Sequence, residues 1–235
     1  MIVLAVDSST PTAAAAISRD GSLIASLRSA AGNTHSECLL PMIEKALSLC
    51  SLTVGDVDLF ACGVGPGSFT GVRIAVATVK GLAAPLGTPC VGVSSLEGCA
   101  ASLSYADGLV VPVFNARRGN VYTAIFSAER GSVSRLTDDD IIPLDELCAS
   151  LRAYGHVVYF AGDAARDALA AAADAGIDAA PVAPSAMLVD AAGMCSLAAL
   201  RYEATDADAK REFTADALSP VYLRPGRAAN AALPD

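Results

Sequence analysis

The chain has 235 residues, of which 53% are hydrophobic, so it is long and apolar enough to bury a sizeable core as one large domain or two small ones. Its formal net charge of -9 disfavours unaided binding to nucleic acid, because such binding depends on Lys and Arg side chains that neutralise phosphates. If RNA is involved in the function, another chain is expected to supply the basic surface.

The first residues, MIVLAVDSS, lack the basic lead, the long apolar run and the small-residue cleavage site of a secretory signal. No segment reaches about 18 uninterrupted apolar residues, the length that a membrane-spanning helix needs. We therefore expect a cytoplasmic chain that does not bind membranes. The seven cysteines are scattered and include no C-x-x-C pair, which predicts reduced, packed thiols rather than disulfides or zinc.

Five short apolar runs predict the strands of a first unit. Those at residues 2–6, 13–17 and 23–27 are separated by turn signals and indicate an antiparallel meander. The runs at 58–64 and 89–93 alternate with two helical segments. The order strand, helix, strand, helix, strand predicts parallel pairing after the meander, and hence an α/β layer.

The first of these helices is predicted from a capping box. Thr34-His-Ser-Glu37 has the S/T-x-x-E spacing in which a hydroxyl and a carboxylate satisfy free backbone donors reciprocally. A helix is expected from there to about Cys50. Pro41 lies inside it and removes one backbone hydrogen bond.

A second unit is expected from about residue 102. The runs at 110–114, 121–126 and 157–161 predict its strands, and the segments 164–175 and 185–203 predict its helices. Residues 115–120 indicate a hairpin connection, and the acidic run 138–140 is expected to be a solvated loop. The tail, 228–235, has little to pack and is expected to be disordered.

The glycine-rich stretch GVGPGSFTG, residues 63–71, precedes the second helix. Its glycines have neither the Walker A spacing nor the dinucleotide-binding spacing. Ser68 can cap the helix, and the free amides at a helix N-terminus attract anions. Two interpretations stay open, a bound phosphate and a purely structural turn, of which the turn is favoured.

Few residues offer catalytic chemistry. His35 and His156 are the only histidines, so no local pair of metal ligands can form, and no G-x-S-x-G elbow occurs. Asp7 lies at a strand end beside three hydroxyl residues and could face magnesium and phosphate in a cleft. The other interpretation, an Asx-type turn, is favoured.

The two helices of the first unit carry more apolar surface than one sheet contact requires. In the first, Leu40, Ile43 and Leu47 form one stripe, and Leu39, Met42, Ala46 and Leu49 form a second. The second helix is apolar around most of its circumference, and Gly71 and Ala75 would allow close approach. Either other parts of the same chain cover these helices, or they form a protein interface.

Four segments resemble the TsaB (YeaZ) family, in the same order as in that family. They are HSECLLPMIEKAL, GVGPGSFTGVRIAVATVKGLA, GVSSLEGCA and SPVYLR, so the resemblance is specific over residues 1 to about 100 and near 219–224. It implies an α/β fold of two RNase H-like lobes of the actin-like ATPase superfamily, with mixed sheets flanked by helices. The first lobe would span 1–101 and be completed by a returning segment, about 204–225. The second, smaller lobe would span 102–203, leaving a tail at 226–235.

The resemblance also implies a function. Members are noncatalytic partners of the TsaD carbamoyltransferase and work with TsaE in the threonylcarbamoylation of adenosine 37 in tRNAs that decode ANN codons. The tRNA would be met only through the complex, and the chain would form a homodimer when alone. We expect the chain to have no catalytic residue, no metal and no cofactor of its own. Weak binding of ATP or ADP is expected, within the complex.

Two sets of site residues follow from the resemblance. The helices at 36–49 and 69–84 would form a bundle with TsaD or with a second copy. The residues expected in this interface are Leu39, Leu40, Met42, Ile43, Ala46, Leu47, Gly71, Val72, Ala75, Val76 and Val79. The residues expected in a vestigial phosphate site are Asp7, Ser9, Thr10, Gly65, Gly67 and Ser68. The chain departs from the family where Asn115 and Asn120 replace acidic residues, which puts charge-dependent contacts there in doubt.

An active enzyme is the alternative, either a small-molecule kinase of the same superfamily or a metallopeptidase. A kinase would need a second phosphate loop, an adenosine loop and a catalytic carboxylate across the cleft, for which Gly162-Asp163 is the one weak candidate loop. A peptidase would need metal ligands that two distant histidines supply poorly. The noncatalytic subunit is favoured.

Overall fold

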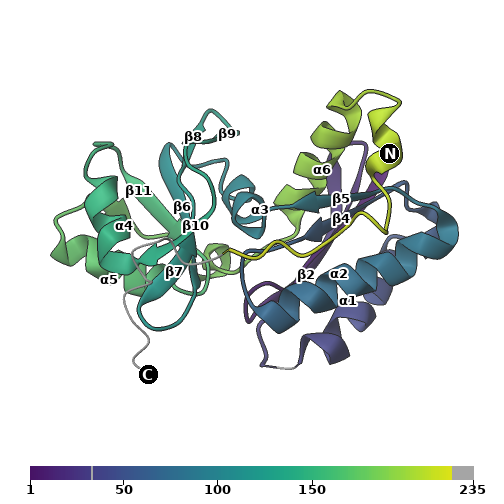
Figure 1. Cartoon of the computed structure of the whole chain (residues 1–235), viewed down its shortest axis with the longest axis horizontal. Helices are drawn as coiled ribbons and strands as arrows, with labels where there is room; N and C mark the ends of the chain where they lie inside the picture. The colour runs from purple at the N-terminus through teal and green to yellow at the C-terminus, as the bar shows by residue number, and fades with distance from the viewer. Residues whose placement is uncertain (33, 224–235) are drawn as a thin grey trace, which may run out of the picture.

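The protein folds into two lobes, each built on one β-sheet (Figure 1). The computed structural model describes residues 1–32 and 34–223. The first sheet has the order β3-β2-β1-β4-β5. Its strands are β1 (Ile2–Asp7), β2 (Ala13–Arg19), β3 (Ser22–Ser29), β4 (Leu59–Gly63) and β5 (Cys90–Val93). Strands β1 to β3 pair antiparallel and β1, β4 and β5 pair parallel, so the predicted meander and parallel layer are confirmed.

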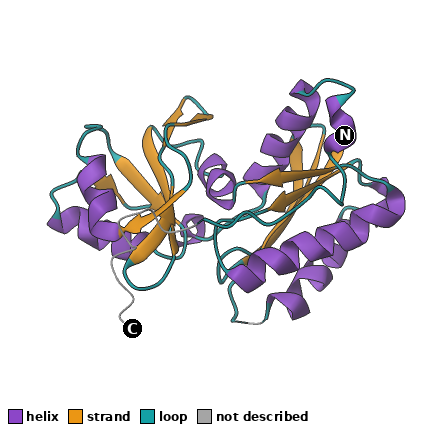
Figure 2. Ribbon diagram, in the orientation of Figure 1, coloured by secondary structure: helices purple, strands orange, loops and turns teal. Residues whose placement is uncertain are grey.

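Helices cover both faces of this sheet, as Figure 2 shows. Helices α1 (His35–Leu49) and α2 (Phe69–Ala83) pack on one face, where Leu4 and Val6 of β1 join their core. Helix α6 (Ala192–Ala204) packs on the other face against Val3 and Ala5. Because successive side chains of a strand point to opposite faces, burial on both sides explains why β1 is a continuous apolar run.

The second sheet is mixed and follows the order β10-β7-β6-β11-β12, with β8 also paired to β6 and β9 paired to β8. Its strands are β6 (Gly108–Asn115), β7 (Asn120–Thr123), β8 (Phe126–Glu129), β9 (Ser132–Arg135), β10 (Asp140–Pro143), β11 (Val158–Ala161) and β12 (Ala179–Ala180). The predicted strand 121–126 is therefore two strands. Helices α4 (Leu144–Leu151) and α5 (Ala165–Asp174) share a core with this sheet. The short helix α3 (Ser95–Ala101) packs against β6 and β9.

The predicted boundary of the second lobe at residue 203 is wrong. Helix α6 starts at Ala192 rather than at 185, and it packs on the first sheet with Met194, Cys195 and Ala198 buried among the residues of β1 and β2. The chain therefore returns to the first lobe at about residue 190. The small residues of α6 can pack on either sheet, so their pattern does not indicate which one they cover. The predicted tail, 226–235, lies outside the described residues.

Two local predictions also fail. Thr34 precedes α1, but its side chain makes no capping hydrogen bond to any described residue, so the predicted capping box does not form. A capping box instead joins Thr53 and Asp56. The acidic run 138–140 is not simply a solvated loop, because Asp139 is half-buried against Arg135 and Asp140 begins β10.

Most of the cysteines are packed, as predicted, because all except Cys38 and Cys50 are buried. None of the seven cysteines, all of which lie in the described part of the chain, is in a disulfide. Burial raises the pKa of Cys90 to about 11 and that of Cys195 to about 12, which keeps these thiols protonated and inert.

One helical run, Phe69–Leu86, is long and apolar enough to cross a membrane by length and composition alone. A third of it (33%) is buried inside the protein, and α2 packs on β4 and β1. Core helices of globular proteins pass the same test, so this run is weak evidence for a membrane span.

Candidate functional site

A cleft of about 720 Å³ lies between the two lobes. The first lobe contributes the β1–β2 loop and the N-terminal ends of α1 and α2. The second contributes the β6–β7 hairpin and Asp163, which follows β11. Residues 221–223 of the returning segment close one side. Ligands of open α/β sheets bind at the carboxyl ends of parallel strands, which makes this cleft the natural candidate site.

The glycine loop is a structural turn packed against the rest of the first lobe. A Cβ atom on Gly67 would lie 2.3 Å from the carbonyl oxygen of Ser9, and one on Gly71 would lie 1.9 Å from that of Ser8. The Ser68 amide donates to the Ser9 carbonyl oxygen over 2.6 Å. The Ser68 hydroxyl accepts from the Gly71 amide over 3.2 Å, so the predicted helix cap is confirmed. The glycines of this turn thus let the backbone of the β1–β2 loop approach closely.

Asp7 is enclosed in the protein and does not face the cleft. Its carboxylate accepts hydrogen bonds from the Ser9 amide (2.7 Å), the Ser9 hydroxyl (2.6 Å) and the Ser95 hydroxyl (2.6 Å). A Cβ atom on Gly63 would lie 1.8 Å from one of its oxygens, so β4 covers it. Burial raises the pKa of Asp7, an effect that these hydrogen bonds oppose. The bond from the Ser9 amide makes the Asx-type turn that the sequence favoured, and the other interpretation, in which Asp7 faces magnesium in the cleft, is wrong.

The remaining residues of the predicted phosphate site are only partly brought together. Ser9, Thr10, Gly67 and Ser68 line the cleft, whereas Asp7 and Gly65 are not among the described residues that do. The hydroxyls of the lining residues already have partners within the chain, because Ser9 donates to Asp7 and Thr10 accepts from the Thr12 amide. These residues do not fit a magnesium-bound phosphate, since no carboxylate among the described residues of the first lobe lines the cleft.

Two titratable groups of the cleft were not predicted as site residues. Asp163 lines it, and burial raises the pKa of its carboxyl, which accepts from the Asn115 amide over 3.0 Å. His35 lines it from the start of α1, and its buried Nδ1 atom has no hydrogen-bond partner among the described residues. The sequence offered Asp163 only as part of the weak candidate loop Gly162-Asp163 and His35 only as a poor metal ligand, because the cleft joins the two residues only in the folded chain.

The hairpin tolerates its departure from the family pattern. The side-chain oxygen of Asn115 accepts from the Arg117 amide over 2.7 Å, as an aspartate oxygen would. Strands β6 and β7 pair on either side of the turn. An amide at residue 115 therefore keeps the fold and removes one negative charge from the cleft.

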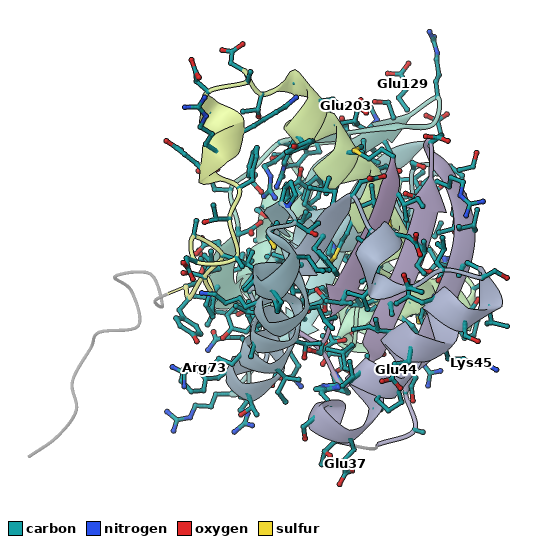
Figure 3. All side chains as sticks on the ribbon, turned by 90° about the vertical axis from the view of Figure 1, so that its right-hand side faces the viewer. Glu37, Glu44, Lys45, Arg73, Glu129 and Glu203 are labelled. Carbon is teal, nitrogen blue, oxygen red and sulfur yellow. The ribbon has the colours of Figure 1, made fainter. Side chains whose placement is uncertain are left out.

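The structure decides which stripe of each helix faces the sheet. Of the residues predicted in the interface, all except Leu40 and Met42 are buried within this chain, so the interface prediction is wrong for the others. Leu39 and Ile43, and the predicted α2 residues from Val72 to Val79, pack in the core of the first lobe. Figure 3 shows Glu44 and Lys45 of α1 and Arg73 of α2 pointing away from the sheet.

Three large apolar side chains of the helix pair are exposed. Leu40 (43% exposed), Leu49 (63%) and Phe69 (55%) are open to solvent. Because a helix turns by about 100° per residue, Leu40 and Leu49, nine positions apart, lie on opposite flanks of α1. Leu49 and Phe69 were not predicted in the interface, because the sequence alone does not tell which side of a mostly apolar helix points outward.

An aromatic cluster ties the returning segment to α2. The Arg73 guanidinium carbon lies 3.7 Å from the centre of the Phe69 ring, and its Nε donates to the Tyr222 hydroxyl over 2.8 Å. The Tyr222 ring lies 5.2 Å from the Phe69 ring, centre to centre. Farther along α2, Lys80 donates to the carbonyl oxygens of Asp216 and Leu218. Residues 216–222 of the returning segment therefore pack along α2 on the first lobe.

Comparison with known proteins places these features in a family. A family model described as "TsaD: tRNA N6-adenosine threonylcarbamoyltransferase" matches residues 28–231, so the chain falls within that wider family. The tRNA threonylcarbamoyladenosine biosynthesis protein TsaB of Bacillus subtilis is 35% identical over 162 residues, which are 69% of this chain and 71% of that protein. The chain belongs to the TsaB (YeaZ) family.

Solved structures agree with this membership. A Pseudomonas aeruginosa protein described as similar to the peptidase YeaZ superposes on this TsaB-family chain with a TM-score of 0.77 and 27% identity, covering 95% of this chain and 99% of that one. Component A of an Acidaminococcus fermentans (R)-2-hydroxyglutaryl-CoA dehydratase superposes with a TM-score of 0.51 and 14% identity, over 86% and 98% of the two chains. The second match concerns the fold alone. The predicted α/β fold of two lobes, with mixed sheets flanked by helices, is confirmed.

Proposed function

We propose that this chain is a noncatalytic subunit in the formation of threonylcarbamoyladenosine at position 37 of tRNAs that decode ANN codons. It would bind a TsaD-like carbamoyltransferase and work with a TsaE-like ATPase. The names of its TsaB relatives support the pathway. The observation that carries the noncatalytic role is the enclosure of Asp7, because the cleft then has no carboxylate from the part of the first lobe that the structure describes.

Phosphoryl transfer depends on groups that hold a metal ion and orient the nucleophile beside the transferred phosphate. Asp7 is covered by Gly63 and Ser95, and Asp163 of the second lobe hydrogen-bonds to Asn115. We therefore expect weak ATP or ADP binding, no hydrolysis and no requirement for a cofactor of its own. The described residues contain no group of three or more His, Cys, Asp or Glu side chains that could hold a metal, which gives a metallopeptidase no support.

The outer side of α1 and α2 is the proposed partner surface. Leu40 of α1 is exposed, and Phe69 of α2 is exposed within the aromatic cluster that it forms with Arg73 and Tyr222. Exposed aromatic and Arg residues are common among the side chains that contribute most to protein binding. Without the transferase, the same surface would pair two copies around a two-fold axis. We expect the chain to act in the cytoplasm and to meet tRNA only through the complex, since its net charge is -9.

Reconstitution tests the proposal. The chain is mixed with the TsaD-like and TsaE-like proteins of its own organism, and tRNA modification is measured with each component omitted. We expect no modification by this chain alone and its loss, or a strong reduction, when this chain is omitted. Full modification by the mixture that lacks it would overturn the proposal.

A further inference from the structure

Helix α3 lies between the two lobes, at the point where the chain first crosses from one to the other (Figure 1). It packs against α6 of the first lobe and against β6 and β9 of the second. An element that contacts both lobes is the place where a change of their relative orientation would have to break contacts.

On the side of the first lobe, α3 and α6 pack with almost no space between them. A Cβ atom on Gly98 would lie 2.5 Å from Cγ of Met194, and one on Gly193 would lie 2.7 Å from the carbonyl oxygen of Gly98. The two glycines let the helix backbones approach closely. Helix α3 is therefore held as part of the first lobe.

On the side of the second lobe, α3 contributes to a shared apolar core. Leu96 and Cys99 are buried there with Val110, Phe114 and Phe126 of the second lobe. This core holds the lobes together but does not by itself select one angle between them, because apolar contacts are not directional.

A cluster of charged side chains adds directional contacts between the lobes. One carboxylate oxygen of Glu97, on α3, accepts from Arg201 of α6 and, over 3.4 Å, from Arg135 of β9. Arg201 also donates to the carbonyl oxygen of Gly92 in β5 over 3.0 Å. Glu97 thus joins a cation of the first lobe to a cation of the second.

The same cluster has a second link between the lobes. Asp139, in the loop before β10, accepts from the Ser94 hydroxyl and from Arg135, each over 2.6 Å. The side chains of Glu97 and Asp139 are each 18% exposed, so solvent and salt screen these pairs less than fully exposed ones. We call Glu97, Arg135, Arg201, Asp139 and Ser94 the Glu97 latch.

We infer that the Glu97 latch fixes the two lobes at one angle, so that the interlobe cleft keeps one width. Hinge closure requires contacts between domains that can separate and re-form. Here any such rotation would separate Arg135 from Glu97 or Ser94 from Asp139. The chain is then a rigid two-lobed body. The inference concerns the isolated chain and does not depend on the proposed function.

Pulsed electron paramagnetic resonance tests the latch. Spin labels are attached through non-natural amino acids at Lys45 of α1 and Glu146 of α4, both exposed and on different lobes, so that the native cysteines stay unlabelled. Labelled protein is diluted with unlabelled protein so that only distances within one chain are measured. The otherwise unmodified chain should give one narrow distance distribution.

The variant Glu97→Gln keeps the shape of the side chain and removes its charge, and it should measurably broaden the distribution, because both arginines lose their ion pair with Glu97. The control Asp208→Asn removes an exposed ion pair with Arg211 in the first lobe and should change nothing. If Glu97→Gln does not fold, as judged by circular dichroism, Arg135→Gln removes the cation of the second lobe and should broaden the distribution likewise. A latch variant as narrow as the unmodified chain, or an unmodified chain that is already broad or bimodal, overturns the inference.

Discussion

Replacing Leu40 by glutamate tests the proposed partner surface, and replacing its neighbour Leu39 supplies the contrast. Leu40 is 43% exposed in the isolated chain, whereas Leu39 is 1% exposed and lies in the core of the first lobe. The same substitution at adjacent positions thus meets solvent in one case and a packed core in the other.

The expected magnitudes differ accordingly. Leu39→Glu loses the burial of a leucine, about 1.5–3 kcal/mol, and encloses an unpaired carboxylate. The sum exceeds about 4 kcal/mol, a large part of the 5–15 kcal/mol that stabilises a typical domain. Leu40→Glu should change folding stability by only about 0.5 kcal/mol. In a complex, the new carboxylate would be desolvated without a partner, which we expect to weaken binding by about 3 kcal/mol, a roughly 100-fold larger dissociation constant.

Three measurements decide the outcome. Urea unfolding followed by circular dichroism should show Leu40→Glu near the unmodified chain and Leu39→Glu strongly destabilised. Calorimetric titration with the TsaD-like partner, and light scattering of the chain alone, should show Leu40→Glu monomeric and weakly bound. The control Leu200→Glu changes an exposed leucine (65%) on α6, away from the proposed surface, and should bind normally. A folded Leu40→Glu variant that binds the partner as tightly as the control would refute the reasoning.

Three further predictions concern the glycine loop, Asp7 and the cleft. Gly71→Ala should lower the free energy of unfolding by more than about 2 kcal/mol, because the new Cβ would meet the Ser8 carbonyl oxygen. Gly81→Ala, which has open space around the new Cβ, should raise the free energy of unfolding by about 0.5–1 kcal/mol. Equal effects of the two variants in urea unfolding would contradict the packing of the loop. Burial raises the pKa of Asp7 above its ordinary value of 3.8, so the folded chain keeps this proton to higher pH than the unfolded chain, and the group lowers stability as pH rises above about 4. The stability of Asp7→Asn relative to the unmodified chain should therefore increase between pH 4 and pH 7, and a constant difference between the two urea curves would count against this. Calorimetry with ATP and magnesium should give a dissociation constant of about 1 mM or larger, and Asp7→Ala should leave it unchanged. Tight, magnesium-dependent binding that Asp163→Asn abolishes would instead favour a kinase.

The sequence by itself determined the elements of the first sheet and how they pair. Its strands are short apolar runs bounded by turn residues, and two helices separate three of them, so the order along the chain implies the antiparallel meander and the parallel layer. These features depend on neighbours in sequence. The cap at Ser68 is of the same kind, because its hydroxyl and the amide that it binds are three residues apart.

Only the tertiary structure decided the rest. The enclosure of Asp7 needs Ser95, which is 88 residues away along the chain, and Gly63 of the adjacent strand. Helix α6 packs on the first sheet, although its composition fits either sheet. Leu39 and Leu40 are equally apolar, and only the rotation of α1 on β2 and β3 places one in the core and the other at the surface. A local pattern specifies which residues can form a helix or strand, but which surface each element meets depends on contacts between residues far apart in sequence.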